Sequence, residues 1–146
     1  MNEIYVSYQE FESEFINLTY TKKSNNSDNV ITKYVVNKIA SYYEGKEIFE
    51  DDGSIEHILP ESNDIKNNNI GNLILLEQAL NGEADCLEYI DKITVYKKST
   101  YKWIKEFISS NTEWSDDKIQ ERSKKLSEFY YTKILAKDIS LNALKR

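Results

Sequence analysis

The chain has 146 residues, of which 40% are hydrophobic and 30% charged, the balance of one globular domain of ordinary size. Its apolar runs are too short to cross a bilayer, and its single cysteine excludes an internal disulfide and a multi-cysteine zinc site. The net charge of −6 argues against tight, nonspecific binding of nucleic acid, but it leaves carboxylates that can bind a metal ion.

These properties predict a single domain over residues 1–146 that does not enter the membrane. The first ten residues lack the basic and apolar regions of a signal peptide, and a chain with one cysteine suits a reducing compartment. We therefore expect a cytoplasmic location.

The first third of the chain is predicted to be helical. Residues 8–20 carry Phe11, Phe15 and Leu18 at helical spacing. A polar stretch at 22–29 indicates a loop, and residues 27–45 then form a stronger helix with Gly45 suited to its end. The predicted buried stripe of this second helix consists of Val30, Tyr34, Val35, Ile39 and either Tyr42 or Tyr43.

The middle of the chain favours two short strands. The apolar segments 54–59 and 72–77 are separated by a long polar connection. Residues 77–99 then have a helical pattern with a break expected near Gly82. Two further helices are predicted at 100–110 and 116–139. The predicted fold is α+β and mostly helical, with a core at about 54–98 flanked by helices at about 7–45 and 99–136.

The only histidine, His57, ends the first predicted strand and directly follows Glu56. A glutamate can bind a divalent cation through oxygen, and a neutral histidine can take a proton from water. Pro60 stiffens the exit from the strand. Asn72 follows 15 residues after His57, and Asn81 lies nine residues further on; each offers an amide oxygen.

The order strand, long connection, strand and helix, carrying these residues, resembles the HNH or ββα-metal (His-Me finger) nucleases. The segments "IEHILPE" (55–61), "NNIGNLILLEQALN" (68–81), "DKITVYKKS" (91–99) and "EWSDDKIQER" (113–122) are similar to the C-terminal nuclease domain of GmrSD-type modification-dependent restriction enzymes. The resemblance covers residues 30 to 135. It implies a ββα-metal core within the predicted α+β domain.

The resemblance also implies roles for individual residues. His57 corresponds to the general base, and Glu56 and Asn81 correspond to ligands of one divalent metal ion, Mg²⁺ or Mn²⁺. Asn72 corresponds to the catalytic-site residue that orients the imidazole or braces the loop. Later family positions are matched by Lys92, Tyr96, Ser99 and Arg122. For Lys92 and Arg122 we expect contact with phosphate.

The implied activity is metal-dependent cleavage of DNA, in phage defence by restriction of modified DNA. Full-length relatives carry an NTP-hydrolysing domain before the nuclease domain, and this chain has no GxxxxGK[ST] loop. We therefore expect a recognition or NTPase partner outside the chain. The alternative is a noncatalytic helical module that keeps the nuclease shape and docks a partner subunit or domain.

Overall fold

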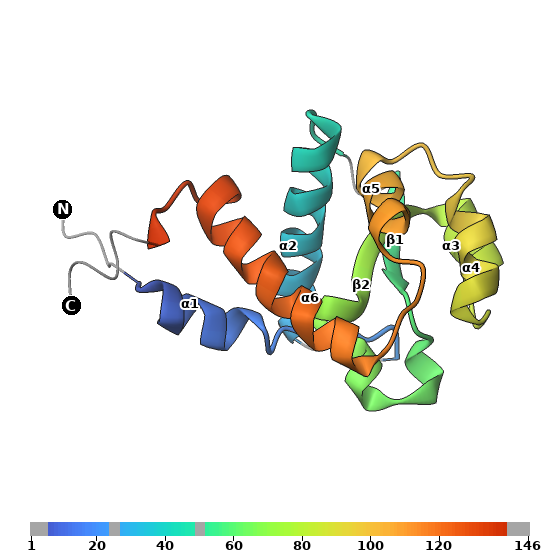
Figure 1. The fold of residues 1–146 in the computed structure, drawn as a ribbon, viewed down its shortest axis with the longest axis horizontal. Helices are drawn as coiled ribbons and strands as arrows, with labels where there is room; N and C mark the ends of the chain where they lie inside the picture. Colours follow the sequence, from blue (N-terminus) through green and yellow to red (C-terminus); the bar gives the residue numbers. More distant parts are fainter. Residues whose placement is uncertain (1–5, 24–26, 49–51, 140–146) are drawn as a thin grey trace.

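The computed structural model describes residues 6–23, 27–48 and 52–139 and confirms a mainly helical α+β fold (Figure 1). Two strands, β1 (Gly53–His57) and β2 (Leu73–Glu77), form its sheet. The helices are α1 (Tyr8–Phe15), α2 (Ser27–Glu44), α3 (Gln78–Ala84), α4 (Tyr89–Tyr96), α5 (Lys102–Ser110) and α6 (Asp116–Phe129), the last continued by the π-helical turn η4 (Tyr130–Ile134).

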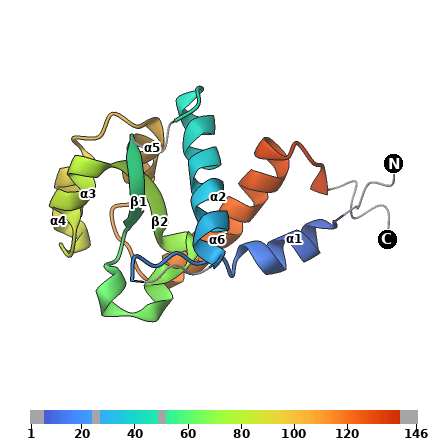
Figure 2. The ribbon, with the colours of Figure 1, turned by 180° about the vertical axis from the view of Figure 1, so that it is seen from behind.

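The two strands pair antiparallel in the centre of the domain, with His57 opposite Leu73 and Glu56 opposite Ile74. They lie between α2 on one side and α3 and α4 on the other (Figures 1 and 2). Because helices cover both faces, Leu73, Ile74, Leu75 and Leu76 are all buried. This explains why β2 reads as a continuous apolar run rather than as an alternating strand.

The connection between the strands folds into three short 3-10 segments, η1 (Glu61–Asn63), η2 (Ile65–Asn68) and η3 (Ile70–Asn72). α6 packs directly on η3. A Cβ added to Gly71 would lie 2.0 Å from the carbonyl oxygen of Ile119, so this close approach requires glycine. The long polar connection is therefore held against a helix that comes nearly fifty residues later in the sequence.

The buried stripe predicted for α2 was wrong in part. Val30 and Tyr34 are exposed, at 74% and 58%, and Tyr42 is 49% exposed. The face that meets the sheet and α5 consists of Thr32, Val35, Val36, Ile39 and Ala40. Burial of the polar Thr32 is possible because its hydroxyl donates to the Thr19 carbonyl at 2.8 Å. Apolar side chains lie on both the exposed and the buried sides of α2, so helical spacing alone does not select the buried face.

The helical break expected near Gly82 lies slightly later. Gly82 is inside α3, and the helix ends at Ala84, where Asp85 takes a left-handed φ of 30° before α4 begins. Within the described ranges, no helix has both the length and the apolar character needed to cross a membrane.

Candidate active site

The structure places Glu56 and His57 at the end of β1 and brings Asn81 against the same strand. The Asn81 amide nitrogen donates to the Ser54 hydroxyl at 2.8 Å and to the Ile55 carbonyl at 3.0 Å. Ser54 and Glu56 are two residues apart on a strand, so their side chains leave the same face. Asn81 therefore lies on the face of β1 that carries Glu56.

His57 is almost fully buried, and its ring is oriented by a backbone group. Its Nε2 lies 2.9 Å from the carbonyl oxygen of Tyr20, in the segment that precedes α2. Since a carbonyl only accepts hydrogen bonds, Nε2 carries the proton and the neutral ring keeps its lone pair on Nδ1. The contact therefore selects the tautomer in which Nδ1 is the basic nitrogen.

Burial lowers the pKa of His57 below its ordinary value of 6.5, with smaller contributions in the same direction from the ammonium groups of Lys22 and Lys92. The Tyr20 carbonyl and the Glu61 carboxylate act in the opposite direction. The imidazole is thus neutral near pH 7, which is the state a general base requires.

Glu56 belongs to a buried polar cluster with α4. Its Oε2 accepts from the Lys92 ammonium at 2.9 Å and from the Tyr96 hydroxyl at 2.6 Å. The same ammonium donates to the His57 carbonyl at 2.6 Å. Burial raises the pKa of Glu56, while Lys92 and Tyr96 act to lower it. The cluster fixes the end of β1, and neither donor uses the other carboxylate oxygen, Oε1.

The two residues expected to bind a metal ion, Glu56 and Asn81, have the Lys22 ammonium nearby in this structure. Asn81 uses its nitrogen to bind β1, so its Oδ1 faces Lys22, whose Nζ lies 3.4 Å away. The same ammonium acts electrostatically on Glu56. An amide oxygen and a carboxylate are ligands that suit a hard divalent cation. In this structure the positive charge near both of them is the Lys22 ammonium. Among the described residues, no group of three or more His, Cys, Asp or Glu side chains is placed to hold a metal ion.

Asn72 braces the connection between the strands. Its Oδ1 accepts from the Leu59 amide at 2.8 Å and from the Trp114 indole at 3.1 Å. Its nitrogen donates to the carbonyls of Leu59 and Asn67 at 2.9 and 2.8 Å. The Ile58 amide, next to His57, donates to the Asn72 carbonyl at 2.9 Å. Asn72 thus holds in place the backbone that follows His57.

Lys92 and Arg122, the two residues expected to contact phosphate, have other partners. Lys92 is fully buried against Glu56. Arg122 donates to the carbonyls of Gly71 and Leu73 at 3.0 and 2.7 Å, and burial lowers its pKa to about 10. Neither arrangement presents a cation at the surface. A phosphate contact by these two side chains therefore has no support in this structure.

Two further residues of the site, Tyr20 and Lys22, come from the segment before α2. The Lys22 amide donates to the Glu61 carboxylate at 3.0 Å, which holds this segment beside the end of β1. No motif marks these positions, and Tyr20 contributes a backbone carbonyl that any residue could supply. The isolated bridge between Thr19 and Asn69 and the Tyr20 amide, which donates to the Asn68 carbonyl at 2.9 Å, also hold this segment in place.

The strand pair followed by a helix, with His57 ending the first strand and Asn81 on the helix, defines a ββα core in a mainly helical domain. The family model described as "GmrSD restriction endonucleases, C-terminal domain" matches residues 5–129, and the chain belongs to this family. It is therefore a restriction endonuclease domain, which implies DNA as the substrate. A search of curated proteins gave no match.

Proposed function

We propose that this domain is a metal-dependent DNA endonuclease of the HNH class that restricts modified DNA in phage defence. The observation that carries the proposal is a neutral His57, oriented by the Tyr20 carbonyl. The Lys22 ammonium, which acts electrostatically on His57 and on Glu56, lies 3.4 Å from Oδ1 of Asn81 and so links the three residues. A single histidine, with its tautomer fixed by a backbone acceptor, is suited to act as a general base.

In the proposed reaction, Nδ1 of His57 takes the proton of the attacking water. The Tyr20 carbonyl then stabilises the resulting imidazolium, because Nε2–H already donates to it. Glu56 and Asn81 would hold one Mg²⁺ or Mn²⁺ ion, which when bound neutralises charge that develops on the phosphate. Asn72 positions the base by fixing the loop that follows His57.

The direct test is cleavage of plasmid DNA and of phage DNA that contains modified bases, with Mg²⁺ or Mn²⁺ and with EDTA. We expect cleavage that requires the metal ion. No cleavage of either DNA with either metal would contradict an independent nuclease activity for this chain.

The second candidate function is a noncatalytic module that docks a partner, such as a recognition or NTPase domain. It is favoured by the contacts of Glu56, because Lys92 and Tyr96 bind its carboxylate in the way that is typical of a buried, structural ion pair. In this case the chain would fold without metal and would show no metal-dependent cleavage, whereas an added partner would bind it.

Asn81→Ala should weaken Mn²⁺ binding by more than ~10-fold, the lower end of what loss of a supporting residue costs a metal site. Calorimetric titration with Mn²⁺ measures this directly, and excess metal should partly restore cleavage. The matched control is Ser54→Ala, which removes a partner of the Asn81 nitrogen but keeps Oδ1. Equal Mn²⁺ affinity in wild type and in folded Asn81→Ala would exclude Asn81 as a ligand.

The cleavage rate should fall with acidification only below about pH 6.5, the ordinary histidine value. Burial lowers the pKa of His57, so the neutral base persists to a lower pH than in an exposed histidine. The rate is then lost as the pH falls through this lowered pKa. Single-turnover rates over a pH series give the midpoint, and a midpoint above 6.5 would contradict this assignment.

A further inference from the structure

A groove of about 1100 Å³ runs along the outward face of α2 and is bounded by η4. Figure 2 shows α2 facing the viewer, with the C-terminal end of α6 and the following turn beside it. The charged and aromatic residues that line the groove include Lys33, Tyr34, Lys38, Tyr42, Lys46 and Lys133.

The groove is basic although the chain is acidic. Four lysines line it against a single acid, Glu47, whereas the whole chain has a net charge of −6. Lys38, Lys46 and Lys133 are exposed. Like charges gathered in a concave surface raise the local concentration of an oppositely charged partner. The expected occupant is therefore an anion rather than an apolar segment of protein.

The aromatic residues of the groove are exposed in a way that suits a nucleic acid. Tyr34 and Tyr42 are 58% and 49% exposed, and the Lys38 ammonium lies 5.3 Å from the centre of the Tyr34 ring. Lysines that alternate with tyrosines along one helix can contact phosphates with their charges and sugars with their rings and hydroxyls. An inorganic anion would use only the lysines.

The N-terminal end of the groove, at Val30, is linked to the candidate active site through the segment before α2. At the N-terminal end of α2, Asn29 exchanges hydrogen bonds of 3.1 and 2.9 Å with the backbone of Thr21. Thr21 lies between Tyr20, which orients His57, and Lys22. α2 has 18 residues and is about 27 Å long, long enough to contact several phosphates of a duplex. DNA in the groove would thus extend away from the site.

We propose that the α2 groove binds the phosphate backbone of the duplex DNA substrate. The inference rests on the proposed nuclease function for its choice of partner, but it concerns binding and is tested without cleavage. The three exposed lysines supply the charge, and the tyrosines lie against the backbone between them.

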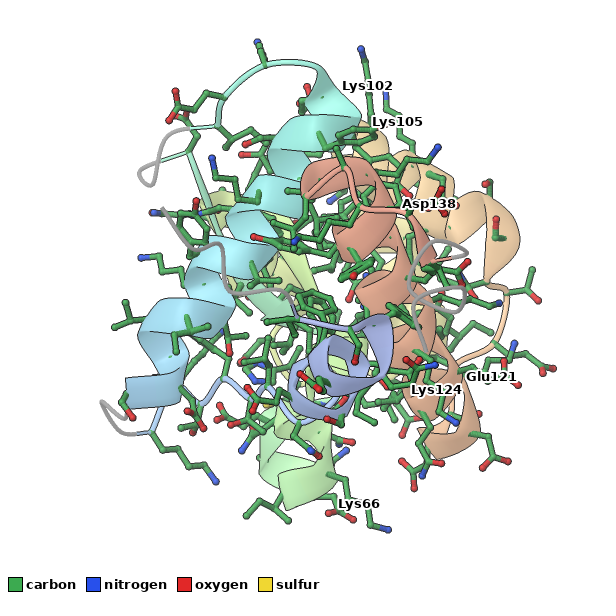
Figure 3. The ribbon with its side chains drawn as sticks, turned by 90° about the vertical axis from the view of Figure 1, so that its left-hand side faces the viewer. Lys66, Lys102, Lys105, Glu121, Lys124 and Asp138 are labelled. Atoms are coloured by element: carbon green, nitrogen blue, oxygen red, sulfur yellow. The ribbon has the colours of Figure 1, made fainter. Side chains whose placement is uncertain are left out.

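The test measures binding of a fluorescein-labelled duplex by anisotropy in EDTA over a series of salt concentrations. One variant replaces Lys38, Lys46 and Lys133 by Glu. The control replaces Lys66, Lys105 and Lys124, exposed lysines on η2, α5 and α6 that Figure 3 labels. Each triple variant changes the net charge of the chain from −6 to −12, so the two differ only in location.

Wild type should bind weakly, and its affinity should fall as salt rises. The groove variant should bind at least ~10-fold more weakly than the control variant, and its salt slope should be smaller by about two to three. If the Glu substitutions destabilise the fold, the lysines are replaced by Gln instead. Equal affinities of the two triple variants, or no measurable binding by wild type at low salt, would overturn the inference.

The two proposals fail in different ways. Loss of DNA binding in the groove variant supports the inference even where the wild type cleaves nothing. If the groove variant keeps metal-dependent cleavage and its DNA affinity is unchanged, the nuclease function is supported and DNA binding by the groove is refuted. The same holds if a protein partner is found to occupy the groove.

Discussion

Replacing Lys92 by methionine should lower the free energy of unfolding by about 3–5 kcal/mol, the usual cost of removing one partner from a buried ion pair. Lys92 is fully buried, and its ammonium binds the Glu56 carboxylate and the His57 carbonyl. Methionine has similar length but no donor, so a buried carboxylate and a buried carbonyl would lose a partner. Chemical denaturation followed by circular dichroism measures the change.

The matched control for this prediction is Lys98→Met. Lys98 also pairs with a glutamate, Glu83, at 3.0 Å, but the two side chains are 55% and 49% exposed. An exposed pair contributes only ~0–1 kcal/mol. The double variant Glu56→Gln with Lys92→Met should recover part of the loss, because it removes the uncompensated charge. A Lys92→Met protein as stable as Lys98→Met would show that the buried pair does not hold the end of β1.

Lys92 also illustrates a limit of reasoning from the sequence. The expected phosphate contact of Lys92 came from its match to a late position of the family pattern, which does not show where the side chain lies. Its partner Glu56 is 36 residues away, so no local pattern reveals the pair. One signal was present: Lys92 and Tyr96 are four residues apart and therefore share a helix face, on which two donors can reach one acceptor.

The elements of the fold were largely predictable because their signals are local. The apolar runs at 54–59 and 72–77 predicted strands that the structure places at Gly53–His57 and Leu73–Glu77. The same rules were insufficient for α2, whose buried face is chosen by the sheet that it contacts. Val30 and Tyr34 have the spacing of core residues, yet they lie in the groove that we propose for DNA.

The candidate site divides in the same way. Glu56 and His57 are adjacent in sequence, and Asn72 and Asn81 follow at a spacing that the strand–strand–helix order explains. The Tyr20 carbonyl could not be found, because it precedes His57 by 37 residues and is a backbone atom without a side-chain signature. Such a contact depends on how the segment before α2 crosses the end of β1, which is a property of the tertiary fold.

The Tyr20 carbonyl selects the His57 tautomer in which Nδ1 is basic, so removal of this histidine should have a large effect on activity. Replacing His57 by Ala should lower the cleavage rate by at least the ~10²–10⁴ that is typical of lost general-base catalysis. Metal binding should survive, because Glu56 and Asn81 remain. The measurement is plasmid or phage DNA cleavage at saturating Mg²⁺ or Mn²⁺, with calorimetric titration of Mn²⁺ on the same protein.

Loss of a buried ring could also lower activity by disturbing the fold, so a second variant separates the two effects. His57→Gln keeps a side-chain N–H that can donate to the Tyr20 carbonyl, but it has no basic nitrogen. If His57 is the base, both variants should be folded in thermal melts and equally slow, and added imidazole should partly restore cleavage by the Ala variant. If His57 serves only to anchor the Tyr20 segment, the Gln variant should cleave at nearly the wild-type rate. A folded His57→Ala protein that cuts as fast as wild type would show that the imidazole is structural, and the proposed mechanism would be wrong for this chain.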